Sequence, residues 1–246
     1  MKNFRVSVMQ IEIENEKFAD FNTVVALDSA KVCVPEYHGM FKKKSTAVEY
    51  VPYPLENHIY MLKKEFRENI VGEILKLKKF GKKPPKFLST FLKNSYGLSL
   101  YEMFFKPYYE KIFQTDLKNV LFADIENLFR KTTPKDILLS NFSRLDTLQN
   151  CPENFDIKTA TELSEPKAVT EVSVKTDRNS YAAVLIPDAK LKTFRITCLG
   201  NLTDCSEKDY NAVVEIAGEV SRAEIDAELA ALPLNPKYAS HDYKNN

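Results

Sequence analysis

Seven aromatic side chains fall between positions 96 and 113 of this chain, and four of them are tyrosines. Their flat rings suit stacking against a base or a sugar, with the hydroxyls facing phosphate or ring oxygens. Stacking contributes about 1–3 kcal/mol per base, enough to orient a nucleotide. The alternative, which composition alone favours, is the core of a helical bundle, because a tyrosine can be buried when its hydroxyl finds a partner. The seven are Tyr96, Tyr101, Phe104, Phe105, Tyr108, Tyr109 and Phe113.

The segment 51–57, with the sequence VPYPLEN, holds Tyr53 between two prolines and Glu56 shortly after them. Proline fixes φ near about −65°, so the backbone of this segment is stiff. A stiff segment suits the presentation of Tyr53 and Glu56 to a ligand. A plain connector into the following helix explains the two prolines equally well.

Other chemistry-bearing patterns are weak. Six lysines between positions 76 and 86 suit nucleic-acid phosphates, but cations also favour a helix C-terminus, and we expect a solvated helix end. The four cysteines form no C-x-x-C pair and the three histidines are scattered, which predicts free thiols and no metal site. There is no G-x-S-x-G motif, and we assign no catalytic residue.

The composition is that of a globular protein. With 246 residues and a hydrophobic fraction of 44%, the chain can form real cores. The formal net charge of +1 provides no general attraction for nucleic acid or anionic membranes. No apolar run reaches membrane-spanning length, and the first residues lack the apolar stretch of a signal peptide. We therefore expect a cytoplasmic protein without a membrane partner.

The elements that must position these residues fall into two kinds. Apolar residues at helical spacing predict a bundle of about five helices between positions 61 and 145. Capping boxes, prolines and glycines give the ends of these helices. The predicted helices are 61–79, 87–95 stopped by Gly97, one that starts at 99–102 and is interrupted or kinked by Pro107, one from Thr115 or Asp116 to Leu128, and one that starts at Thr133.

Alternating residues and turn signals predict strands in the remainder of the chain. A capping box at 221–224 predicts a short helix that ends at Leu232. The predicted fold class is α+β, a helical bundle beside a mostly antiparallel sheet, in three regions at 1–60, 61–145 and 146–246. The predicted strands are 4–8, 169–174, 181–186, 193–199 and 212–216, with a polar connection from 146 to 167.

Several segments resemble, in their order along the chain, the middle of the UDP-galactopyranose mutase-like flavoproteins, relatives of the amine oxidase-type FAD enzymes. Segment 51–58 resembles that family's V-P-Y-P-F-Q-N-N-type segment, and 106–113 resembles its K-P-Y-x-x-K-x-W-type segment. The further matches support these two. They are 181–188, 194–197 and 201–203, which resemble W-x-Y-x-P-D, F-x-R-x and S-N-x-S, and the terminal pair Asp242 and Tyr243.

The resemblance implies a helical substrate domain and an antiparallel sheet beside an FAD-binding domain. The family's mutases use reduced FAD as a nucleophile on the anomeric carbon, and they interconvert the pyranose and furanose forms of UDP-galactose. By position, the resemblance implies that the uridine, the sugar and the diphosphate contact residues of the matched segments. These are Tyr53, Glu56, Asn57, Tyr108, Tyr109, Phe113, Arg130, Arg195, Asn201 and Tyr243.

The chain also departs from that family. Glu56 stands where glutamine is usual, Tyr109 where asparagine or threonine is usual, and Phe113 where tryptophan is usual. There is no G-x-G-x-x-G among only six glycines, and phosphate cradling needs the backbone freedom that glycine supplies.

We therefore expect a partial or diverged isomerase of this kind that retains the sugar-nucleotide-binding half and is inactive alone. FAD, the family's cofactor, is not expected to bind to this chain by itself. The expected partners are a UDP-sugar and either a separate flavin-binding chain or a second copy of this chain. The alternative is a non-catalytic protein-interaction module derived from such an enzyme.

Overall fold

The computed structural model describes most of the chain, and its strands form one mixed sheet. The described residues are 23–27, 49–77, 85–125, 133–142, 167–201 and 210–239. The strands are β1 (Thr23–Leu27), β2 (Glu49–Pro52), β3 (Val169–Lys175), β4 (Ala183–Leu185), β5 (Thr193–Thr197), β6 (Asn211–Ala217) and β7 (Lys237–Tyr238). Their order in the sheet is β2-β1-β4-β5-β6-β3-β7.

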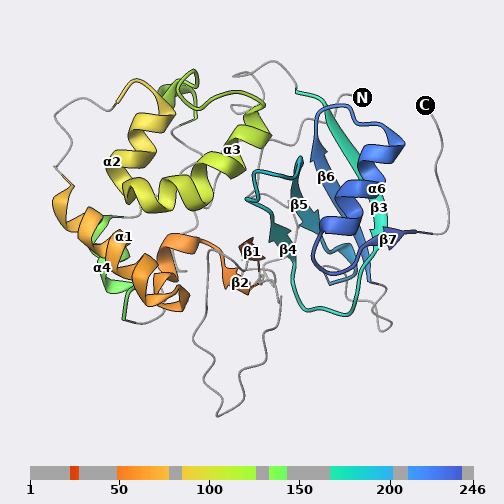
Figure 1. Cartoon of the computed structure of the whole chain (residues 1–246), viewed down its shortest axis with the longest axis horizontal. Coiled ribbons are helices and arrows are strands. Elements are labelled where there is room, and N and C mark those ends of the chain that lie inside the picture. The colour runs from red at the N-terminus through yellow and green to blue at the C-terminus, as the bar shows by residue number, and fades with distance from the viewer. Residues whose placement is uncertain are drawn as a thin grey trace, which may run out of the picture.

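The fold is α+β, as the sequence predicts. Neighbouring strands run antiparallel except β1 and β4, which are parallel. The helices are α1 (Lys64–Lys76), α2 (Leu88–Leu100), α3 (Lys106–Phe113), α4 (Pro134–Leu139) and α6 (Arg222–Ala231). Figure 1 shows α1 to α4 gathered beside the β1, β2 and β4 end of the sheet, with α6 at its other end.

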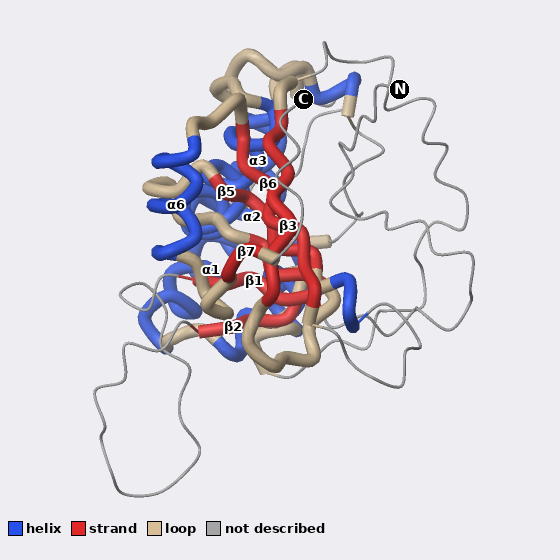
Figure 2. Tube along the Cα trace, turned by 90° about the vertical axis from the view of Figure 1, so that its right-hand side faces the viewer, coloured by secondary structure: helices blue, strands red, loops and turns tan. Residues whose placement is uncertain are grey.

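Two cores follow from the alternation of side chains along the strands. On β1, Val24 and Ala26 pack in the core beneath α6, whereas Val25 and Leu27 pack in the core of the helical part. Figure 2 shows α6 along one side of the strands. Because both faces of β1 are buried, the four residues after Thr23 form a continuous apolar run, VVAL, without a polar alternation to reveal a strand.

The strands from β3 to β6 confirm the predicted ones, and β1, β2 and β7 are additional strands that the sequence did not predict. The predicted strand 4–8 lies outside the described residues, and so does nearly all of the connection from 146 to 167. The one cysteine among the described residues, Cys198, is buried with a free thiol, as predicted.

Helices α4 and α6 both begin with a capping box, a short motif that can be found in the sequence. At α4, Thr133 accepts from the backbone N–H of Asp136, and the Asp136 carboxylate accepts from the backbone N–H of Thr133. Ser221 and Glu224 make the same reciprocal bonds at α6. Pro134 occupies the first turn of α4, where its missing N–H costs least.

Replacing Thr133 by alanine is expected to lower the free energy of unfolding by about 1 kcal/mol, because the first turn of α4 loses an acceptor for its backbone N–H. Urea denaturation followed by far-UV circular dichroism measures the change. Thr133→Ser retains the hydroxyl and is expected to behave like the wild type. An equal loss in both variants would show that the methyl group, rather than the cap, stabilises this turn.

The predicted helix stop at Gly97 is wrong in detail. Gly97 has a φ of 82° and a ψ of 167°, but helical structure resumes at once on its far side. The predicted capping box is replaced by a contact between helices: the backbone N–H and the hydroxyl of Ser99 both donate to the Glu73 carboxylate of α1, at 2.8 Å each. Glu102, the expected capping partner, pairs instead with Lys106 at 3.6 Å.

Pro107 does not end the third predicted helix. A π-helical turn, Tyr101–Phe105, precedes α3, and Pro107 lies in the first turn of α3. A proline removes one backbone donor and crowds the preceding turn, and a widened turn accommodates both effects. The aromatic segment is therefore one bent helical run from α2 to α3.

The predicted helix from Thr115 or Asp116 to Leu128 is wrong over its described part, 115–125, which forms turns and a short 3₁₀ turn at Phe122–Asp124. The carbonyls of Leu117 and Val120 accept from the first-turn N–H groups of Ser89 and Leu88, at 3.2 and 2.9 Å. These carbonyls cap α2. The helical part thus has four described α-helices in place of about five.

No described helix is long and apolar enough to cross a membrane.

Candidate functional site

The structure places the predicted site residues on four elements. A 3₁₀ turn, Leu55–Asn57, follows β2 and contains Glu56 and Asn57. Tyr53 lies just before this turn. Tyr108, Tyr109 and Phe113 lie on α3, Arg195 lies on β5, and Asn201 ends the short 3₁₀ turn after β5. Arg130 and Tyr243 lie outside the described residues.

Phenol groups from both motifs meet in the interior beside the Glu56 carboxylate. A hydrogen bond joins the side chains of Tyr53 and Tyr109. Burial raises the pKa of Tyr53 well above its usual value, and the neighbouring Tyr109 and Glu56 raise it further. Burial and Glu56 also raise the pKa of Tyr96 and of Tyr109. These phenols therefore remain protonated hydrogen-bond donors at neutral pH.

The aromatic rings of α3 stack on one another. The Phe105 and Tyr109 rings lie at an interplanar angle of 7°, and those of Tyr109 and Phe113 at 18°. The Phe104 and Tyr108 centroids are 5.2 Å apart at an angle of 15°. Most of the aromatic segment is thus the core of the helical part, the alternative that composition favours, and Phe113 belongs to this stack.

A buried ion pair on the sheet adjoins this cluster. Arg195 on β5 pairs with Glu215 on β6: Nε donates to Oε2, and Nη2 donates to Oε1 at 2.6 Å. The Arg195 side chain is 6% exposed and that of Glu215 is 2% exposed, so both charges are desolvated. The hydroxyl of Thr197 also donates to the Glu215 carboxylate at 3.3 Å.

Tyr108 lies between the phenol cluster and the ion pair. Burial raises its pKa well above the usual value, and the Arg195 charge partly opposes this increase. Its hydroxyl is fully buried and has no hydrogen-bond partner among the described residues. An unpaired buried hydroxyl costs about 1–3 kcal/mol, so this orphan donor needs an explanation.

Five of the predicted site residues thus come together where the helical part meets the sheet: Tyr53, Glu56, Tyr108, Tyr109 and Arg195. Asn57 is buried in the 3₁₀ turn that carries Glu56. Asn201 ties connections of the sheet together, because its Nδ2 donates to Asn179 Oδ1 at 2.8 Å and to the Tyr181 carbonyl at 2.7 Å.

Sequence reasoning missed three residues at this junction. Glu215 is the one charged residue of the strand NAVVEIA, and Arg195 is the one charged residue of TFRIT. A buried charge is retained only with a partner, so the two lone charges were a usable signal. Lys111 lies inside the aromatic motif, and Tyr96 lies at its start; nothing in their spacing separates them from the surrounding core.

The described residues contain no metal-ligand cluster, and the helix start that follows Gly218 is only partly open to a dinucleotide phosphate. They contain no group of three or more possible protein ligands for a metal ion. The strand–turn–helix unit formed by β6 and α6 contains Gly218, but two N–H groups at the start of α6, those of Ser221 and Glu224, are bonded within its own capping box. A dinucleotide phosphate needs such backbone N–H groups free.

This fold and site define an α+β protein in which a helical part packs against a mostly antiparallel sheet, with buried polar groups at the junction. Among solved structures, a UDP-galactopyranose mutase in its reduced form shares the fold, with a TM-score of 0.60 and 12% sequence identity. The match covers 89% of this chain and 63% of that chain, so this chain spans less than two thirds of the mutase's length. No family model and no curated protein matches the sequence.

Proposed function

We propose that this chain is a diverged UDP-galactopyranose mutase-like protein that retains the half that binds the sugar nucleotide, and that it does not turn over substrate alone. The shared fold and the order of the matched segments support the proposal. In this proposal a separate flavin-binding chain supplies the missing chemistry.

The observation that carries the proposal is the Tyr108 hydroxyl, which is buried without a partner among the described residues. It lies among polar groups contributed by both motifs that resemble the mutases. A polar atom of a ligand, such as a sugar hydroxyl or a phosphate oxygen, would complete this hydrogen bond.

The neighbouring groups have suitable chemistry for an anionic, hydroxyl-rich ligand. Tyr53 and Tyr109 are protonated donors, and the Glu56 carboxylate is an acceptor for a sugar hydroxyl. Arg195 supplies positive charge next to Tyr108. Arg130 and Tyr243 remain further proposed contacts for the diphosphate.

Calorimetric titration with UDP, UDP-galactose and UDP-glucose tests the proposal. We expect saturable binding of at least one of them at or below millimolar concentration. Failure of all three to bind at millimolar concentration would overturn the proposal. A parallel titration with FAD, followed by flavin fluorescence, is expected to show no binding. Binding of FAD would instead favour the hypothesis that this chain is a complete flavoenzyme.

Tyr108→Phe tests whether the Tyr108 hydroxyl binds a ligand or only belongs to the core, and it does so by two measurements. Without ligand, the free energy of unfolding is expected to stay unchanged or to rise by about 1 kcal/mol, because an unsatisfied buried hydroxyl is removed. The affinity for the UDP-sugar is expected to fall about tenfold, the effect of one lost hydrogen bond of about 1.4 kcal/mol.

Tyr50→Phe is the matched control, because the Tyr50 ring packs at a tilt against Tyr181 on the other core and lies outside the cluster. It is expected to leave ligand affinity unchanged. If Tyr108→Phe destabilises the ligand-free protein instead, the hydroxyl has a structural partner, and the observation that carries the proposal is lost.

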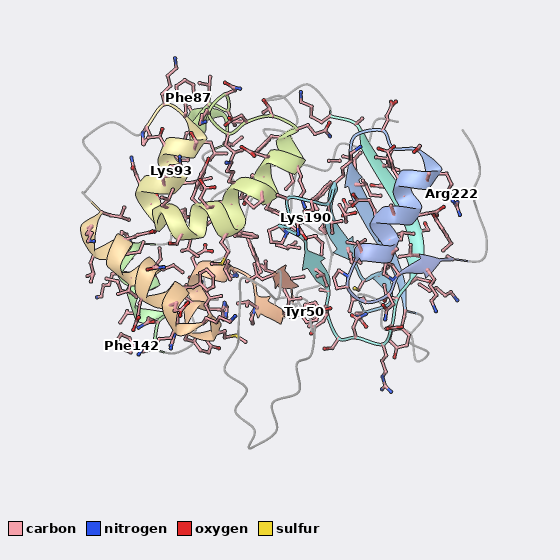
Figure 3. All side chains as sticks on the ribbon, viewed as in Figure 1. Tyr50, Phe87, Lys93, Phe142, Lys190 and Arg222 are labelled. Carbon is pink, nitrogen blue, oxygen red and sulfur yellow. The ribbon has the colours of Figure 1, made fainter. Side chains whose placement is uncertain are left out.

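A second candidate is a non-catalytic interaction module, and the exposed side chains near α4 favour it. Phe142 is 81% exposed and Leu139 is 45% exposed. Figure 3 shows Phe142 on the outer side of the helical part. Two results together would favour this module over the sugar-nucleotide site: a melting temperature that does not change when a UDP-sugar is added, and a dimer that forms as the protein concentration increases.

A further inference from the structure

Lys111 is a partly buried lysine that bonds helix α3 to the base of the β4–β5 hairpin. Its Nζ donates to the Ile186 carbonyl at 2.7 Å and to the Thr193 carbonyl at 2.8 Å. These carbonyls belong to residues at the two ends of the connection between β4 and β5, which Lys190 marks in Figure 3. A single side chain therefore fixes both ends of this connection to the helical part.

The same hairpin is held from the other side by α6. The Glu228 carboxylate accepts from the backbone N–H of Lys192 at 2.8 Å, and from the backbone N–H and the hydroxyl of Thr193 at 2.9 and 2.7 Å. Thr193 is fully buried. Its carbonyl is thus bound by a cation from α3, while its N–H and hydroxyl are bound by an anion from α6.

We propose that Lys111, Thr193 and Glu228 form a latch that joins the helical part to the sheet, and that release of Lys111 opens the β4–β5 hairpin and α3 locally. This inference does not depend on sugar-nucleotide binding. Charged hydrogen bonds to backbone groups are among the stronger ones in proteins, and here they connect two parts of the molecule with separate cores.

The latch has a built-in pH dependence. Burial lowers the pKa of Lys111 to about 8, although Asp188 of the β4–β5 connection and Glu228 of α6 favour its charged form. In an opened, solvated state the lysine has its ordinary pKa of about 10.4. Between these two values the closed state binds fewer protons than the open state, so raising the pH favours the closed latch. The neutral amine that forms above pH 8 still has two N–H groups, one for each of the Ile186 and Thr193 carbonyls.

Hydrogen–deuterium exchange of Lys111→Met, resolved by peptide, tests the latch. We expect amides of α3 and of the β4–β5 hairpin to exchange about tenfold faster or more, because two charged hydrogen bonds are lost. Amides of the β3–β6 pair are expected to keep the wild-type rates. Lys118→Met is the matched control, because Lys118 is 70% exposed and pairs with Asp116 on the surface.

A pH series on the wild-type chain supplies an independent test if Lys111→Met does not fold. After correction for intrinsic exchange rates, protection of the hairpin is expected to rise about tenfold between pH 7 and pH 9. Uniform acceleration across the whole sheet in Lys111→Met, or hairpin protection that does not rise with pH in the wild type, would overturn the latch.

Discussion

Glu215→Ala is expected to lower the free energy of unfolding by about 3–5 kcal/mol, one of the two largest effects we predict. The substitution leaves the Arg195 guanidinium, whose side chain is 6% exposed, without the carboxylate that accepts from its Nε and Nη2. A buried charge that loses its partner retains the full cost of its desolvation. Urea denaturation followed by circular dichroism measures the change.

The double substitution of Arg195 by methionine and Glu215 by leucine tests the cause. It removes both charges and retains most of the volume, so we expect it to recover most of the lost stability. Glu68→Ala, which removes an exposed ion pair with Lys64, is expected to change stability by less than about 0.5 kcal/mol. A double variant as unstable as Glu215→Ala would assign the loss to packing instead of charge.

Gly97→Ala is the second large effect, with an expected loss of about 2–4 kcal/mol. Gly97 has a φ of 82°, which side-chain-bearing residues adopt only with strain of about 1–3 kcal/mol. A Cβ atom at this position would also lie 2.7 Å from Glu73 Oε2. That oxygen accepts from the backbone N–H of Ser99, so relief of the clash breaks a hydrogen bond between α1 and the α2–α3 run.

Gly72→Ala is the matched control on the neighbouring helix. A Cβ atom on Gly72 would meet nothing within 4 Å, and the residue lies inside α1. Alanine is the better helix former by about 0.8–1.0 kcal/mol, so we expect a gain in stability. If Gly97→Ala were equally harmless, the bend between α2 and α3 would have to be adaptable and the Glu73–Ser99 contact dispensable. Thermal denaturation of the two variants decides this.

The parts of the fold that the sequence predicts correctly depend on neighbouring residues. The capping boxes at Thr133 and Ser221 satisfy helix N–H groups within three residues, so a short motif is enough to place them. The alternation along β3 is visible because one of its faces is exposed. Such signals do not require knowledge of where the rest of the chain lies.

The missed elements depend on distant partners. β1 is buried on both faces and pairs with β4, which lies beyond the entire helical part. The apolar spacing from Leu117 onwards suits a helix, but the carbonyls of Leu117 and Val120 bond to the start of α2 instead. Tertiary hydrogen bonds of this kind override local propensity.

The candidate site shows the same division. The two motifs identify Tyr53, Glu56, Tyr108 and Tyr109, and the structure brings these residues together. Pairing of Arg195 with Glu215 requires the β5–β6 register, which spacing alone does not provide. The bonds of Lys111 require α3 to lie against the β4–β5 hairpin, so nothing in the spacing of the motif marks this lysine as different from its neighbours.

The parallel pairing of β1 with β4 has a kinetic consequence. Thr23 lies opposite Ala183, so the whole helical part must be enclosed in a loop before this pair can close. Pairs such as β5 with β6 join segments close in sequence and carry a smaller loop-closure cost. Folding should therefore begin in the antiparallel strands and in the helices, and insertion of β1 should set the final, slow rate. During synthesis, β1 and its antiparallel partner β2 leave the ribosome long before β4 exists, and the edge of β1 that pairs with β4 must stay soluble until β4 arrives.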